Sequence, residues 1–159
     1  MQSQLSQIAA LNQKDKGAAY VALIPEIFSR PNPTSLAADL HSLIDTLVNQ
    51  EHVGLVVSRH ALSEVVKALG QQPGLDDLEL RKRLVEDAIS TIQPRVSSYE
   101  EQVSYRDYDV YCSHNRQINA LRFQLADILE AEEEWTDAAR VLMGISLDSG
   151  QRRVNTGYV

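Results

Sequence analysis

The residues best suited to chemistry lie in one short stretch, residues 103–117, which reads VSYRDYDVYCSHNRQ. It holds the only cysteine of the chain, Cys112, with His114 close behind. Such a pair could act as a nucleophile with its base, or supply two ligands to zinc. Zinc needs three or four ligands, and the sequence has no second Cys-x-x-Cys or paired histidines. Nothing in the sequence supplies an oxyanion hole, so we expect no catalytic residue, no metal and no cofactor, and an exposed free thiol at Cys112.

The other three histidines give no stronger signal for chemistry. His41, His52 and His60 fall in separate segments, without the HExxH spacing of metalloproteases. We therefore interpret them as solvated or capping side chains.

Composition narrows the class of protein. The chain has 159 residues, enough for a single domain, and a formal charge of −7 from 22 acidic against 15 basic residues. This charge repels phosphate backbones, so we expect no nucleic-acid partner. A lone cysteine, no signal-peptide pattern and no apolar run of membrane-spanning length indicate the cytoplasm or nucleus, with no membrane partner.

The elements that would position these residues are helical. Apolar residues recur at spacings of three and four across 34–50, directly after Pro33, and again across 76–94. We predict that the second of these helices starts at the capping-box-like Asp76-x-x-Glu79 and is closed by Pro94. Three more helices are predicted, at residues 3–12, 16–30 (kinked or split at Pro25) and 55–69. The only β-like run, 52–58, is short.

Helices of this length joined by short turns predict an all-α fold, an α-solenoid of stacked helix pairs. The last pair lies in LRFQLADILEAEEEWTDAARVLMGI, residues 121–145. Here we expect Ala138 and Ala139 to sit where two helices cross closely. We expect Trp135 to plug the gap between them, with an exposed anchor as the alternative. The acidic run 130–134 is interpreted as a solvated turn, or else as a contact for a basic partner. Beyond Leu142 we expect an uncapped apolar face that favours marginal stability or self-association.

Several segments carry residue patterns that are more specific than helix formation requires. TIQPRVSSYEEQ (91–102), LADILEAEEEWTDAARVLMGI (125–145) and LDSGQ (147–151) resemble, in this order, the N-terminal part of the fourth-subunit family of the COP-nine (constitutive photomorphogenesis) signalosome. The segment LVVSRHAL (55–62) is similar to a helix of the same family. The resemblance runs from about residue 36 to the end of the chain. The motif residues that it identifies as structural are Gln93, Pro94, Arg95, Glu100, Glu101, Gln102, Trp135, Ala138, Ala139, Gly144 and Gly150.

The resemblance implies a function that no single residue reveals. In that family the subunit is a non-catalytic scaffold of the complex that removes a ubiquitin-like modifier from cullins. It implies an arm of helical repeats over residues 1–159, with other signalosome subunits and cullin–RING ligases as partners, in the nucleus and cytoplasm. The family's C-terminal PCI domain, which includes a winged helix, is absent from this sequence. A proteasome-lid non-ATPase subunit, a free-standing helical-repeat adaptor and, least favoured, a small hydrolase using Cys112 are the alternatives.

The 103–117 stretch interrupts the family pattern. In the family, EEQ is followed directly by a helix that fits INALRFQLADILE, whereas here fifteen residues separate Gln102 from Ile118. Without them, one continuous apolar seam results, made of Tyr99, Ile118, Leu121, Leu125 and Ile128. With them, at about 100° per residue, the second half of the seam turns by roughly 60°.

Our hypothesis is that the 103–117 stretch is a retained intron. Val103-Ser104 can be encoded by a splice-donor sequence and Gln117 by an acceptor CAG, and Val159 fits a second unspliced donor followed by a stop. A genuine loop is the alternative, as is one straight helix from about 98 to 131. Arg95 is expected to pair with Glu100 or Glu101, or else to touch a partner.

Overall fold

The computed structural model describes residues 1–71, 77–101 and 108–145, and for 98–101 and 108–113 it describes the backbone alone. These residues form seven α-helices and one 3-10 helix, and the expected all-α class is confirmed. The elements are α1 (Gln2–Ala9), α2 (Gln13–Phe28), α3 (Pro33–Asn49), η1 (Glu51–Val53), α4 (Leu55–Gln71), α5 (Leu78–Glu101), α6 (Tyr108–Ala131) and α7 (Trp135–Met143).

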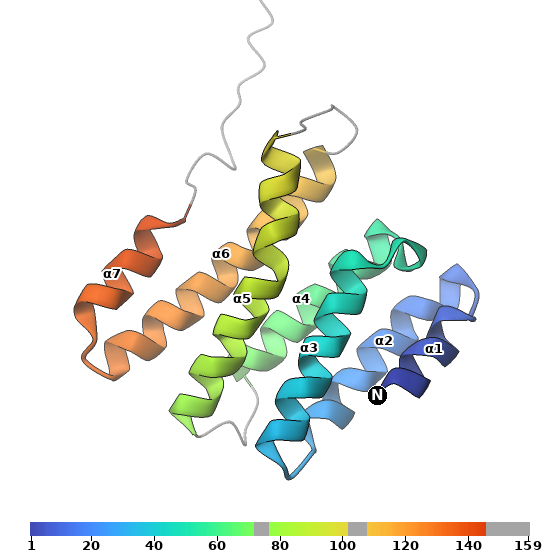
Figure 1. Ribbon diagram of the computed structural model, residues 1–159, viewed down its shortest axis with the longest axis horizontal. Helices are drawn as coiled ribbons and strands as arrows, with labels where there is room; N and C mark the ends of the chain where they lie inside the picture. The colour runs from blue at the N-terminus through green and yellow to red at the C-terminus, as the bar shows by residue number, and fades with distance from the viewer. Residues whose placement is uncertain (72–76, 102–107, 146–159) are drawn as a thin grey trace, which may run out of the picture.

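The helices form two layers, as expected for a helical-repeat arm. Helix α3 packs on α5 in one layer, and α4 packs on both α2 and α6 in the other. In Figure 1 the layer of α1, α3, α5 and α7 faces the viewer, and α2, α4 and α6 lie behind it. The α5–α6 and α6–α7 pairs hold the layers together at the C-terminal end. None of the described helices is long and apolar enough to cross a bilayer.

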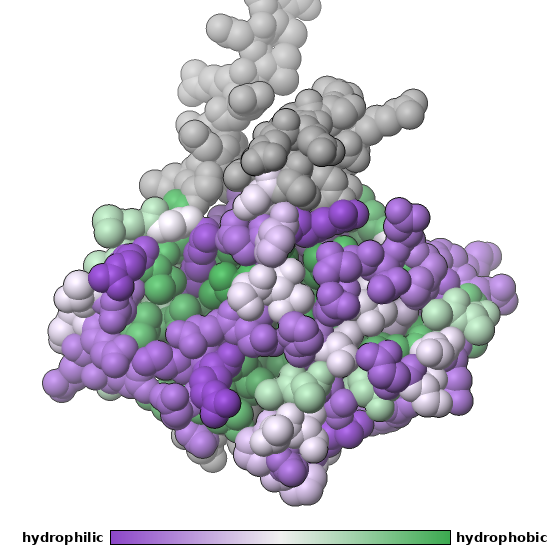
Figure 2. All heavy atoms as spheres, in the orientation of Figure 1, coloured by the Kyte–Doolittle hydropathy of each residue, from purple (hydrophilic) through white to green (hydrophobic). Residues whose placement is uncertain are grey.

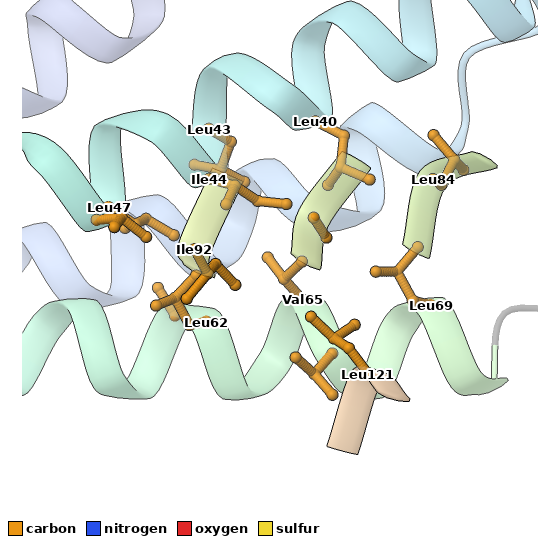
Figure 3. Packing of buried hydrophobic residues seen from close by; sticks show 14 of the residues in the cluster. Leu40, Leu43, Ile44, Leu47, Leu62, Val65, Leu69, Leu84, Ile92 and Leu121 are labelled. Atoms are coloured by element: carbon orange, nitrogen blue, oxygen red, sulfur yellow. The ribbon is translucent and has the colours of Figure 1, made fainter. Parts of the chain in front are cut away.

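One hydrophobic core runs between the layers, built from the periodic apolar residues of each helix. It includes Leu40, Leu43, Ile44 and Leu47 of α3, Leu62, Val65 and Leu69 of α4, Leu84 and Ile92 of α5, and Leu121 of α6 (Figure 3). Burying each such side chain stabilises the fold by about 1.5–3 kcal/mol relative to leaving it exposed.

Local signals fix several helix ends as predicted. Pro33 is the first residue of α3, and the side chain of Asn32 accepts a hydrogen bond from the Thr34 amide at 2.9 Å. The start of α5 differs by a residue, because Asp77 accepts from the Leu80 amide; Asp76 lies outside the described residues. The β-like run at 52–58 is helical, forming the end of η1 and the start of α4 around Gly54, whose φ is 74°.

The prediction that Pro94 closes its helix is wrong. Helix α5 continues through Pro94 to Glu101, and α2 likewise runs unbroken through Pro25. A proline inside a helix removes one hydrogen bond and costs about 3 kcal/mol. In α5 the buried side chains of Ile92 and Val96, on either side of Pro94, offset that cost by packing into the core.

The straight helix from 98 to 131 is also wrong. Helices α5 and α6 are separate and lie side by side as a hairpin (Figure 1). Residues 102–107 between them lie outside the description. From Ile118 onward the predicted seam is confirmed, with Ile118, Leu121, Leu125 and Ile128 all buried.

Candidate interaction surface

One arginine, Arg122, links the C-terminal helices α5, α6 and α7 by hydrogen bonds. Arg122 of α6 donates from Nη2 to Oε1 of Gln93 in α5 at 2.9 Å, and from Nη1 to the carbonyl oxygen of Gly144, just after α7. A guanidinium is suited to this task because its donors form a rigid planar fork. Two of the motif residues, Gln93 and Gly144, are therefore brought together by a third residue that the motif does not contain.

The α6–α7 crossing depends on one small residue rather than on a plug. Ala138 is 2% exposed and lets α7 approach α6 closely, whereas Ala139 faces solvent. Trp135, the first residue of α7, is 62% exposed, so the prediction that it plugs the gap is wrong. The α6–α7 contact is made by Ala138, and the indole of Trp135 takes no part in the core.

The acidic turn between α6 and α7 is anchored to α5. Lys82 donates to Oε2 of Glu132 at 2.7 Å and to Oε2 of Glu134 at 3.0 Å. These two carboxylates raise the pKa of Lys82 above its usual range. The turn is largely solvated, as interpreted, since Glu130, Glu133 and Glu134 are exposed and Glu132 is partly covered. Glu133 makes the turn itself, with a positive φ of 61°.

A groove opens between α5 and α7 on the face shown in Figure 2. Its lining residues are Ile89 of α5, Arg122 and Leu125 of α6, and Arg140, Val141 and Gly144 at the end of α7, and its volume is about 230 Å³. We call it the α5–α7 groove. Figure 2 shows hydrophobic residues between α5 and α7 with hydrophilic residues around them.

A second, larger groove runs between α3 and α5, with a volume of about 670 Å³. Its α3 wall consists mostly of small residues, and its α5 wall carries Arg83, Glu86 and Asp87. His41 lies at its rim with Nδ1 3.0 Å from Oδ2 of Asp87. The histidine is thus bound to a carboxylate across two helices rather than merely solvated, while His52 and His60 are exposed as expected.

The residues that first suggested chemistry do not assemble into a site within the described residues. His114 is 4% exposed and lines a cavity of about 230 Å³ with Arg95 and Ser58. The side chain of Cys112 lies outside the description, so its predicted exposure stays a prediction. Among the described residues no three histidine, cysteine or acidic side chains gather as metal ligands would.

The remaining motif residues are dispersed. Pro94 and Arg95 lie on α5, and the side chains of Glu100 and Glu101 are not described, nor are Gln102 and Gly150. The pairing of Arg95 with a glutamate therefore stays a prediction. Sequence reasoning missed Lys82 and Arg122, because a lone basic residue on a helix has no local pattern that reveals a partner 29 or 50 positions away.

Comparison with known proteins gives a consistent result. No family model matches the chain. It is 35% identical to the COP9 signalosome complex subunit 4 of Drosophila melanogaster over 140 residues, which is 88% of this chain and 29% of that protein. It is 30% identical to the subunit of the same name in Arabidopsis thaliana over 159 residues, 99% of this chain and 34% of that protein. The chain spans about a third of the length of the curated relatives it matches.

Proposed function

Because the chain is homologous to COP9 signalosome subunit 4 over nearly its whole length, we propose that it works as a non-catalytic interaction arm of a signalosome. The homology is the observation that carries this proposal. The fold supports it, since a two-layered stack of helices offers long surfaces for protein contact. Its partners would be other signalosome subunits and the cullin–RING ligases from which the complex removes a ubiquitin-like modifier, in the nucleus and cytoplasm.

The α5–α6–α7 region is the part of the surface we assign to this work. The motif residues Gln93, Ala138 and Gly144 act there by holding three helices in register through Arg122 and the close α6–α7 approach. Their role is to shape the α5–α7 groove rather than to react. The exposed side chains of Trp135 and Met143 extend the same C-terminal region toward partners.

The test is association with purified components. The tagged 159-residue chain is mixed with signalosome subunits lacking subunit 4, and separately with a cullin–RING ligase, and complexes are resolved by size-exclusion chromatography. We expect co-elution with at least one of them. A folded chain that elutes alone from both mixtures would contradict the proposal and favour a free-standing helical-repeat adaptor.

A control separates misfolding from absence of binding. Leu121→Asp places a charge in the core and should abolish association by unfolding the chain, as circular dichroism would record. Trp135→Ala changes only an exposed residue and should leave the helical content intact. Loss of association in Trp135→Ala with an unchanged spectrum would assign the contact to the C-terminal region.

A further inference from the structure

We propose that the α5–α7 groove binds an acidic segment of a partner protein, in which one bulky apolar side chain is flanked by carboxylates. The inference rests on the proposed function and adds to it the chemistry of a partner. It is carried by two features of the groove, an apolar floor that remains partly open and an arginine that pairs with no carboxylate among the described residues.

The floor sets the size of the apolar group. Leu125 is buried at the bottom, while Ile89 and Val141 on the two walls are only partly covered and keep apolar surface for a ligand. The volume of about 230 Å³ falls below the roughly 300–1,000 Å³ of pockets for drug-sized ligands. One large aliphatic or aromatic side chain is the group that suits it.

The charge of the groove determines which charged residues the partner segment should carry beside its apolar side chain. Both hydrogen bonds of the Arg122 guanidinium in the described structure go to neutral acceptors, an amide and a carbonyl oxygen. No carboxylate among the described residues pairs with it. A partly buried cation without an opposing charge is an attractive position for a partner's carboxylate.

Arg140 adds a second positive charge at the opposite wall. It is paired with Asp137, one turn earlier on α7, but both side chains are at least half exposed. Exposed pairs of this kind contribute only about 0–1 kcal/mol, so Arg140 can turn to an incoming carboxylate at little cost. The groove is thus locally basic in a chain whose net charge is −7.

The α3–α5 groove lacks this preference for an acidic ligand. It has the larger volume, and its α5 wall carries Arg83 beside Glu86 and Asp87, so neither sign of charge is favoured. Arg83 is exposed, lies in the same helical layer and makes no ion pair with any described residue. It is therefore a matched control for Arg140.

The test uses fluorescence anisotropy with labelled twelve-residue peptides. One set carries Asp and Glu around a central Phe or Leu, a second replaces the acids by Lys, and a third replaces the central residue by Ala. We expect the parent chain to bind the first set alone. Arg140→Glu should weaken binding by at least about tenfold, Arg140→Lys by less, and Arg83→Glu by no more than about twofold.

Several outcomes would overturn the inference. They are equal weakening by Arg83→Glu, equal binding of the basic peptides, and no binding of any acidic peptide that has a central Phe or Leu. Equal binding of the alanine set would reduce the groove to a general anion attractor and also overturn it. Association with signalosome subunits without peptide binding refutes this inference alone, whereas peptide binding without such association refutes the proposed function alone.

Discussion

The two parts of α6 bury side chains of opposite character. Its body, from Ile118 to Leu129, buries only apolar residues, with Leu121 fully enclosed. Its start buries His114, Asn115 and Gln117, which make up most of the buried polar side chains in the described structure. Both parts belong to one continuous helix and pack into the same hairpin with α5.

This difference shows where along α6 the hydrophobic pattern stops. His114 stands four residues before Ile118, which is the place that Tyr99 would take if the fifteen residues 103–117 were absent. The 103–117 stretch thus extends the helix without continuing its apolar seam. One consequence is visible at Asn115, whose side-chain Nδ2 is buried without a hydrogen-bond partner in the described residues.

The largest effect is expected in the body of α6. Leu121→Ala should lower the free energy of unfolding by about 2–5 kcal/mol, since it removes a fully buried side chain and leaves a cavity. Urea denaturation followed by circular dichroism measures it. Phe123→Ala, two positions away and half exposed, is the control and should change stability far less. Equal losses from the two variants would mean that α6 does not bury the face described.

At the start of α6 an apolar substitution should stabilise the protein instead of destabilising it. Asn115→Leu should raise the free energy of unfolding by about 1 kcal/mol, because it removes a buried amide whose Nδ2 lacks a partner in the described residues and adds apolar contact. The same urea titration detects it. Destabilisation by more than about 1 kcal/mol would show that the Asn115 side chain has a polar role that the comparison overlooks.

Deleting residues 103–117 tests the comparison as a whole. Joining Gln102 to Ile118 should leave a cooperative helical fold within about 1 kcal/mol of the parent, because the part of α5 after Pro94 can then become the start of α6, where Tyr99 continues the seam. Thermal and urea unfolding of the deletion variant measure this. Loss of the cooperative transition would make the stretch an integral element of the fold.

The intron hypothesis also makes a prediction about the transcripts in the cell. If the 103–117 stretch is a retained intron, sequencing of transcripts should reveal a major form that joins Gln102 to Ile118 and continues past Tyr158. Transcripts that always contain the stretch would refute the intron hypothesis and leave a genuine insertion.

The smallest effect is expected at the far end of the hairpin, where Lys82 holds the acidic turn. Lys82→Met should lower the melting temperature by less than Leu121→Ala does, because the ion pairs lie near the surface. The raised pKa of Lys82 fixes the pH dependence. Its contribution is complete below the unfolded pKa of about 10.5 and is lost as the pH rises through the folded value.

Melting curves of the parent and Lys82→Met at increasing pH check this. The gap between their melting temperatures should be constant near neutral pH and shrink at pH values above about 10.5. A difference in melting temperature that widened with rising pH would contradict the assigned partners. A difference that did not change when salt was added would argue against an ion pair.

Periodicity predicted most of the fold. The apolar spacing located α3, α4 and the body of α6, and the family resemblance agreed with the relatives found by comparison. Two of the errors arose at Pro94 and Trp135, where a local rule was applied without regard to the neighbouring side chains. A proline or a tryptophan has an intrinsic preference, but core packing around Ile92 and Val96 in one case, and the close approach at Ala138 in the other, decided the outcome.

The candidate surface was less predictable than the fold. The motif named Gln93 and Gly144 but not Arg122, which joins them, and no spacing in the sequence links Lys82 to Glu132. Such contacts depend on which helices stack, and that choice is made by the whole core rather than by any segment.

By itself the sequence determined the helical class, the buried seams and the relationship to signalosome subunit 4, because hydrophobic period and residue identity are properties of short segments. Only the tertiary structure decided that α5 passes through its proline, that Trp135 faces solvent, and that a groove lined by Arg122 and Arg140 opens between α5 and α7. Those features arise from side chains distant in sequence that compete for the same space and the same hydrogen bonds, and that competition is settled only when the helices pack.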